Sequence, residues 1–171
     1  LTPKFEYLLD EIDQPISLFP PPNLEIVLNY LNNLKPIEGF IYKNYTPEGT
    51  NNLEIPRMYF TSFNGKRIDA IRTKIEEWFN SKSISENEYY ILIACLIETV
   101  PFYANISGVY AAFHKKWDPR AKKELKLRSI NLIDNNKKNR VFNDNSINLI
   151  ERYDYDLIYL DPPYNSRQYA P

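Results

Sequence analysis

The sequence predicts an α/β chain with a mainly helical middle and a strand, helix and strand at its carboxyl end. The aromatic, β-branched run Tyr155–Leu160 has the composition of a buried strand, and the prolines at 162–163 end it because proline has no backbone N–H. A short apolar stretch at 141–143 and helical spacing over 146–153 precede it, which favours a compact right-handed crossover unit. Asp161 is therefore expected at the carboxyl end of a strand, where open α/β sheets bind ligands.

Helical periodicity begins at Asn23, where apolar residues recur at helical spacing as far as Leu34, and Pro36 ends the pattern. The segment 37–61 is rich in aromatic residues and broken by turns, which predicts loops and short strands. Two of its tyrosines, Tyr42 and Tyr45, fit either a small core or a recognition surface.

Two further helices are predicted between residues 64 and 100. Asn64 is expected to cap the first, whose apolar stripe is Ile68, Ile71, Ile75 and Phe79, and Asp69 is expected to pair with Arg72 on its surface. Ser85 and Glu88 have the spacing of a capping box for the second. This second helix is apolar on nearly all sides over 89–97, which predicts a core position, and Pro101 disturbs its end.

Composition excludes several classes of protein. The chain has 171 residues, 43% of them hydrophobic, which is enough to bury a core. Its 4 glycines are scattered, so they form no glycine-rich cofactor turn. The single Cys95 lies in an apolar run and is expected to be a buried structural thiol. One histidine with one cysteine does not supply the usual ligands of a zinc site, and no metal site is expected. No signal peptide or membrane-spanning run is present, which predicts a cytoplasmic protein without membrane contact.

Positive charge is concentrated in one stretch of a chain whose net charge is -1. Residues 111–140 contain ten Lys and Arg residues against three acidic ones. This stretch is either a solvated face or a surface for nucleic-acid phosphates. The segment 105–117 leads into it with asparagine, glycine, aromatic and then basic residues, a pattern that favours a loop facing DNA over a plain surface loop.

The motif Asp161-Pro162-Pro163-Tyr164 combines a carboxylate, backbone carbonyls and an aromatic ring. Such a group suits a flat heterocycle with an exocyclic amino group, because the ring can stack while the oxygen atoms accept hydrogen bonds from the two N–H groups. An adenine of duplex DNA reaches such a site only after it has rotated out of the helix.

The motif and the following Asn165-Ser166-Arg167-Gln168-Tyr169 resemble the Dam-like class of adenine-specific DNA methyltransferases. The resemblance implies a Rossmann-like S-adenosylmethionine-dependent methyltransferase sheet with a mainly helical target-recognition insertion. It implies methyl transfer to N6 of adenine in double-stranded DNA by base flipping and direct displacement, and it allows a cognate restriction endonuclease as a partner. It also implies three segments: 1–36 as part of the catalytic lobe or its connector, 37–130 as the insertion, and 131–171 as the start of the catalytic half.

The resemblance also implies roles for individual residues. Asp161, Pro162, Pro163 and Tyr164 are expected to be catalytic, and Asp144, Asn145 and Asp161 are expected to bind the cofactor. The residues expected to contact DNA are Tyr110, His114, Lys115, Lys116, Arg120, Lys122, Lys123, Asn165 and Arg167.

The family's glycine-containing cofactor loop is missing, so we expect the chain to be an internal fragment that is inactive alone. Two alternatives stay open. One is amino methylation of cytosine N4 or of a base in RNA by the same motif, and the other is a DNA-binding remnant without catalysis.

Overall fold

The computed structural model describes residues 3–9, 12, 23–108, 112–133 and 135–161. The chain divides into two compact units, Leu1–Ile133 and Asp134–Pro171. None of the helices among the described residues is both long enough and apolar enough to span a bilayer.

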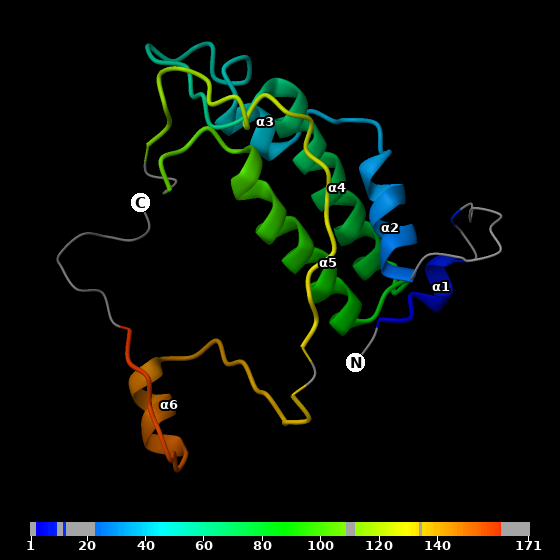
Figure 1. Ribbon diagram of the computed structural model, residues 1–171, viewed down its shortest axis with the longest axis vertical. Coiled ribbons are helices and arrows are strands. Elements are labelled where there is room, and N and C mark those ends of the chain that lie inside the picture. Colours follow the sequence, from blue (N-terminus) through cyan, green and yellow to red (C-terminus); the bar gives the residue numbers. More distant parts are fainter. Residues whose placement is uncertain (1–2, 10–11, 13–22, 109–111, 134, 162–171) are drawn as a thin grey trace. The chain divides into compact units, whose positions relative to one another are not determined.

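The first unit is a helical bundle built around one long helix (Figure 1). Helix α4, Ser62–Asn80, packs against α2, Asn23–Asn32, and α5, Glu86–Thr99. The short helix α1, Glu6–Leu9, contacts α2. These helices confirm the periodicity seen in the sequence, because the stripe Ile68, Ile71 and Ile75 is buried on α4 while Phe79 is partly buried.

The ends of α4 and α5 are fixed by capping residues. Ser85 and Glu88 form the predicted capping box, in which each side chain bonds the backbone of the other residue. The prediction for α4 was wrong, since Thr61 caps this helix by accepting a hydrogen bond from the backbone N–H of Asn64. After α5 the chain continues as the 3-10 helix η1, Val100–Tyr103. This helix contains Pro101, where the sequence predicts a disturbed helix end.

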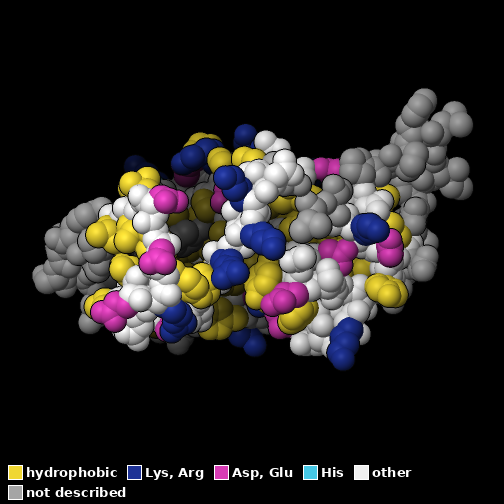
Figure 2. All heavy atoms as spheres, turned by 90° about the horizontal axis from the view of Figure 1, so that it is seen from below, with side chains coloured by type: hydrophobic (Ala, Val, Ile, Leu, Met, Phe, Trp, Pro, Cys, Tyr) yellow, Lys and Arg dark blue, Asp and Glu magenta, His cyan; other side chains and the backbone are white. Residues whose placement is uncertain are grey.

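Helix α5 has one buried face rather than a buried surface all round. Leu92, Cys95 and Leu96 are buried, whereas Tyr90 and Ile97 are 58% and 63% exposed. Burial raises the pKa of the Cys95 thiol, which fits the predicted structural role because a neutral thiol is a poor nucleophile. Hydrophobic side chains also reach the surface between charged ones in the space-filling view (Figure 2).

The segment predicted to hold loops and short strands contains a helix instead, α3, Phe40–Tyr45. Its first N–H groups are bound by a side chain of α4: the Asp69 carboxylate accepts hydrogen bonds from Gly39, Ile41 and Tyr42 at 3.1, 2.9 and 2.8 Å. A carboxylate is favourable there because the first turn of a helix has unpaired N–H groups. Asp69 is accordingly buried and not on the surface with Arg72, which pairs with Glu76 instead.

The second unit contains helix α6, Ser146–Arg152, as predicted, but no strand among its described residues. The expected strands at 141–143 and 155–160 were wrong for this structure, and their apolar side chains are exposed, with Leu157 at 87% and Tyr159 at 86%. A strand needs a neighbour that pairs with its backbone N–H and C=O groups. The described residues of this unit supply only α6 beside the run.

Candidate nucleic-acid interface and catalytic motif

The loop that the sequence predicts to face DNA is closed at its base by Asn105. Ile106 and Phe113 form an antiparallel bridge, and the N–H of His114 donates to the Asn105 carbonyl at 2.9 Å. The fully buried Asn105 side chain donates to the carbonyls of Met58 and His114 at 3.0 and 2.8 Å and accepts from the N–H of Asp118 at 2.9 Å. One amide therefore fixes both ends of the loop to the segment before α4.

Aromatic rings pack against the end of this loop at Phe113. Phe113 packs edge-on against Tyr59 with ring centroids 5.1 Å apart, and Tyr59 packs edge-on against Tyr45 at 5.5 Å. Tyr45 is partly buried and packs against the main core, which favours the small-core interpretation for this residue. Tyr42 lies in α3 with the Lys66 ammonium 4.6 Å from its ring centroid.

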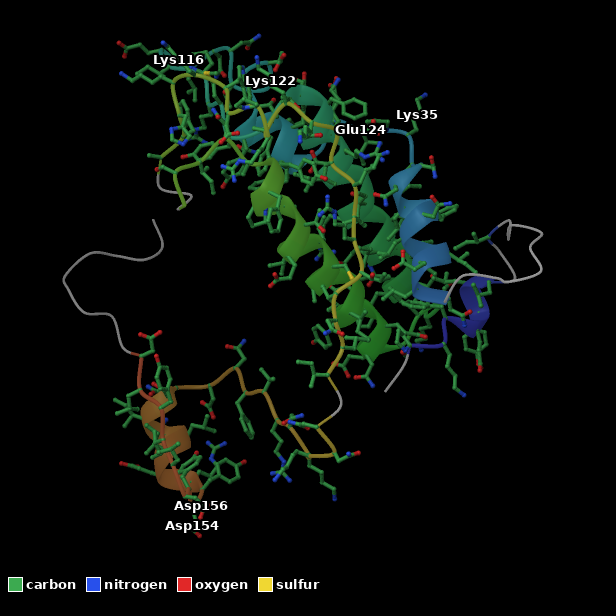
Figure 3. The ribbon with its side chains drawn as sticks, in the orientation of Figure 1. Lys35, Lys116, Lys122, Glu124, Asp154 and Asp156 are labelled. Carbon is green, nitrogen blue, oxygen red and sulfur yellow. The ribbon has the colours of Figure 1, made fainter. Side chains whose placement is uncertain are left out.

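The basic side chains after the loop are exposed. His114, Lys115, Lys116, Lys122 and Lys123 all reach the surface, and Figure 3 shows Lys116 and Lys122 at the end of the unit that carries α3. Ion pairs within the described part of the chain leave these four lysines without a carboxylate partner. Their charge is thus available to a polyanion.

Arg120 differs from these lysines because it is paired with Asp118. Its guanidinium donates to both carboxylate oxygens, with the shortest contact 2.7 Å, and its backbone N–H donates at 2.8 Å. The guanidinium and then the backbone N–H hold the pKa of Asp118 at about 2. Arg120 can reach a phosphate only by sharing or leaving this pair.

A buried asparagine also holds the chain that follows. Asn64 lies inside α4 and donates to the carbonyls of Ala121 and Lys123 at 3.2 and 2.9 Å, while its oxygen accepts from the N–H of Leu125 at 3.0 Å. Sequence patterning missed this role. The available signal was that Thr61 and Ser62 already offer caps, which leaves a poor helix former, Asn64, inside the helix.

The second unit places Asp161, the first residue of the motif expected to be catalytic, at the border of a groove. Asp161 is exposed and lines an open hollow of about 470 Å³ together with Ser146 of α6. The other lining residues are Leu149, Ile150, Tyr155, Leu157, Ile158, Tyr159 and Leu160. The groove therefore combines an apolar, partly aromatic wall with a carboxylate at its border.

The two residues expected to bind the cofactor stand just before α6. The Asn145 side chain accepts from the N–H of Ile147 at 3.0 Å and caps the helix. Asp144 accepts from the N–H of Asn145 at 2.8 Å and pairs with Arg152 at 3.1 Å. Each oxygen has a structural partner and keeps a further lone pair for a ligand.

Six of the residues assigned roles from the sequence lie outside the described part of the chain. They are Tyr110, Pro162, Pro163, Tyr164, Asn165 and Arg167.

Comparison with known proteins identifies the class of protein. Residues 22–171 match the model of the D12 class N6 adenine-specific DNA methyltransferases. The chain belongs to this family.

Individual relatives agree with that family. The modification methylase StsI of Streptococcus sanguinis is 40% identical over 146 residues, which cover 84% of this chain and 21% of that protein. The type II methyltransferase M.FokI of Planomicrobium okeanokoites is 44% identical over 145 residues, which cover 83% of the chain and 22% of that protein. M.NlaIII of Neisseria lactamica is 40% identical over 144 residues, covering 84% and 42%.

The chain therefore spans about a fifth of the length of the first two relatives and about two fifths of the third. No solved structure matches it.

Proposed function

We propose that this chain takes part in site-specific methylation of adenine N6 in double-stranded DNA, with S-adenosylmethionine as the methyl donor. The observation that carries the proposal is the motif that begins at Asp161, in a chain that belongs to a family of adenine-specific DNA methyltransferases. The exposed position of Asp161 on the border of a groove supports it, because a substrate base needs open access to the carboxylate.

In this proposal the motif prepares the amino group of a flipped adenine. The Asp161 carboxylate and the Pro162 carbonyl accept hydrogen bonds from its two N–H groups, and the Tyr164 ring stacks on the base. The lone pair of an aromatic amine is delocalised into the ring, so two acceptors favour the pyramidal form in which the nitrogen attacks. Held in line with the methyl group, the nitrogen needs no covalent intermediate with the enzyme.

The groove beside α6 supports the proposed binding of S-adenosylmethionine. Its apolar wall, which includes Ile150 and Tyr155, suits an adenine ring, and Asp144 and Asn145 offer acceptors at the start of α6 for the amino group of that ring. Bound there, the sulfonium would supply an activated methyl group. Because the Asn145 oxygen also caps α6, we propose that it holds both the helix and the cofactor.

The rest of the family's sheet is part of the same proposal. The exposed run Tyr155–Leu160 is bulky and apolar or aromatic at every position except Asp156, and such a nearly continuous run is typical of a strand buried between helices. We propose that it joins a Rossmann-like sheet in the complete enzyme, which would give Asp161 its position at the end of a strand.

The proposed contacts to DNA are made by the Asn105-anchored loop and the lysines after it. Lys115, Lys116, Lys122 and Lys123 would bind phosphates, and the loop tip near Ser107 and Gly108 would approach the base edges. The relative StsI is named a modification methylase, so we propose that the methylation protects DNA against a cognate restriction endonuclease.

The test replaces Asp161 with alanine in the full-length protein and measures transfer of labelled methyl groups to duplex DNA. Transfer should fall by at least 1,000-fold, roughly 4 kcal/mol in the transition state, because an acceptor for the amino group is lost. Affinity for the duplex should stay within about threefold, since phosphate contacts dominate it.

Asp154→Ala is the matched control, as Asp154 is an exposed aspartate of the same unit that lies outside the run Tyr155–Leu160 (Figure 3). It should transfer methyl groups at the wild-type rate. Equal loss in both variants, or full activity in Asp161→Ala, would contradict the assigned role. A wild type that binds DNA without any transfer would favour the non-catalytic alternative.

A further inference from the structure

The segment after Lys123 alternates between buried and exposed residues as it crosses the helical bundle. Leu125 and Leu127 are buried, whereas Glu124, Lys126 and Arg128 are exposed. Alternation with a period of two is the property of an extended backbone, in which every second side chain lies on the same face at intervals of about 6.7 Å. The exposed row is therefore Glu124, Lys126 and Arg128.

Asparagine side chains hold this segment in place without a strand partner. Asn32 of α2 donates to the Leu127 carbonyl at 3.1 Å and accepts from the Leu127 N–H at 2.7 Å. Asn64 of α4 accepts from the Leu125 N–H at 3.0 Å, and Thr99 of α5 accepts from the Arg128 N–H at 3.4 Å. Three helices thus bind three of its N–H groups, which fixes the row before any ligand arrives.

The one acidic member of the row is neutralised from inside the bundle. The Arg67 guanidinium, whose side chain is only 6% exposed, lies 3.1 Å from the Glu124 carboxylate. It also donates to the carbonyl of Asn32, so the same arginine supports the end of α2 that holds Leu127. Glu124 therefore opposes an approaching anion much less than an unpaired carboxylate would.

The two cations of the row have no such partner. Among the residues that the structure describes, neither Lys126 nor Arg128 forms an ion pair. Arg128 borders an open hollow of about 510 Å³, whose lining includes Phe102 and the acidic Glu98 of α5. No ion pair joins Glu98 to Arg128 in this described region, so the guanidinium keeps its donors for a ligand.

We propose that 124–128 is a phosphate-binding track in which Lys126 and Arg128 contact successive phosphates of one DNA strand, outside the loop that reads the bases. This proposal rests on the proposed function for its ligand, duplex DNA. Cations on a fixed extended backbone bind the sugar–phosphate chain and set its register without reading sequence. The track extends the surface of Lys122 and Lys123 along the same segment.

The test compares Lys126→Ala/Arg128→Ala with the full-length wild type on cognate and non-cognate duplexes from 50 to 500 mM salt. Log affinity falls as log salt rises, and the loss of two phosphate contacts should make this negative slope shallower by about 2. If the contacts vanish near 1 M salt, the same relation gives a loss of about 30-fold at 0.15 M. The loss should be equal for both duplexes, so their ratio of affinities stays constant.

Lys4→Ala/Lys74→Ala is the matched control. It removes the same charge from the first unit at residues that pair with Glu6 and Glu77. The salt slope of this control should equal that of the wild type. In a separate comparison of single variants, Lys126→Arg keeps the charge and should have most of the affinity that Lys126→Ala loses. A double variant with an unchanged slope, or a control with an equal fall, would overturn the track.

The outcomes separate the track from the proposed function. If the wild type methylates DNA while the double variant keeps the wild-type slope, the track is wrong and the function stands. If the salt slopes of the wild type and the double variant differ as expected but the wild type transfers no methyl group, the track stands and the function fails. A change in the cognate to non-cognate ratio would assign Lys126 and Arg128 to base readout and overturn the track.

Discussion

Replacing Asn105 with alanine tests whether this one amide holds the loop 106–113, which we propose to face DNA. The side chain is fully buried and makes three hydrogen bonds to backbone groups, at 3.0, 2.8 and 2.9 Å. Alanine leaves two carbonyls and one N–H without that partner. Each group is part-buried, so a cost near the low end of the range, about 1 kcal/mol each, gives a loss of about 3 kcal/mol in the free energy of unfolding.

The assay combines denaturant unfolding with hydrogen exchange at the amides of His114 and Asp118. Both amides bond to Asn105 in the wild type, one to its carbonyl and one to its side chain. The Asp118 amide should lose protection in the variant, and the loop should open more often than α4 and α5 do.

Asn33→Ala makes the same chemical change at an exposed residue, whose side-chain amide donates to Asn29 one helical turn earlier. This control should lose less than about 0.5 kcal/mol. If Asn105→Ala were as stable as Asn33→Ala, with normal protection at Asp118, the loop would be held by other contacts and the reasoning would be refuted.

Two further predictions concern pH and packing. The pKa of Asp118 is about 2 in the folded protein, below the ordinary value of 3.8, so its pair with Arg120 contributes stability above about pH 4 and loses that contribution as the pH falls toward 2. Unfolding followed between pH 5 and 2 should therefore show a smaller acid-induced loss in Asp118→Asn than in the wild type. In Gly65→Ala the added Cβ would lie 2.5 Å from the Thr46 methyl group, so we expect a net loss of about 1 kcal/mol, which Thr46→Ser should reverse by removing that methyl group while keeping its hydroxyl. Urea unfolding of Gly65→Ala and of the double variant with Thr46→Ser measures the loss and its reversal. A Gly65→Ala variant as stable as the wild type would contradict the close packing of α3 on α4.

Features that depend on neighbouring residues in the sequence were predictable. Ser85 and Glu88 are three residues apart, and the capping box needs nothing outside that turn. The stripe on α4 and the end of α5 at Pro101 follow from helix geometry and from the missing N–H of proline. The helix at 146–152 was found for the same reason.

Features that depend on distant partners were not predictable in this way. Asp69 and Asn64 each suggested a common local role, an ion pair and a cap, but their partners lie 27 to 30 and 57 to 61 residues away. Helix α3 has its first N–H groups bound by Asp69, so the sequence of α3 alone did not predict it. The run at 155–160 has the composition of a strand, but composition does not supply the neighbouring strand that pairing requires.

The candidate site divides along the same line. The motif at Asp161 and the exposed lysines were visible because their residue types carry the chemistry. The asparagines that hold the basic segment, Asn32, Asn64 and Asn105, carry no charge and no catalytic group, so only their hydrogen bonds reveal them.

The most direct test of the proposed function is to identify the methylated base. The full-length protein is incubated with labelled S-adenosylmethionine and duplex DNA, and the DNA is digested to nucleosides for separation. The label should co-elute with N6-methyldeoxyadenosine. DNA incubated with the Asp161→Ala variant should contain no labelled nucleoside. Label in N4-methylcytosine, or no label from a folded protein that binds the duplex, would contradict adenine methylation by this motif.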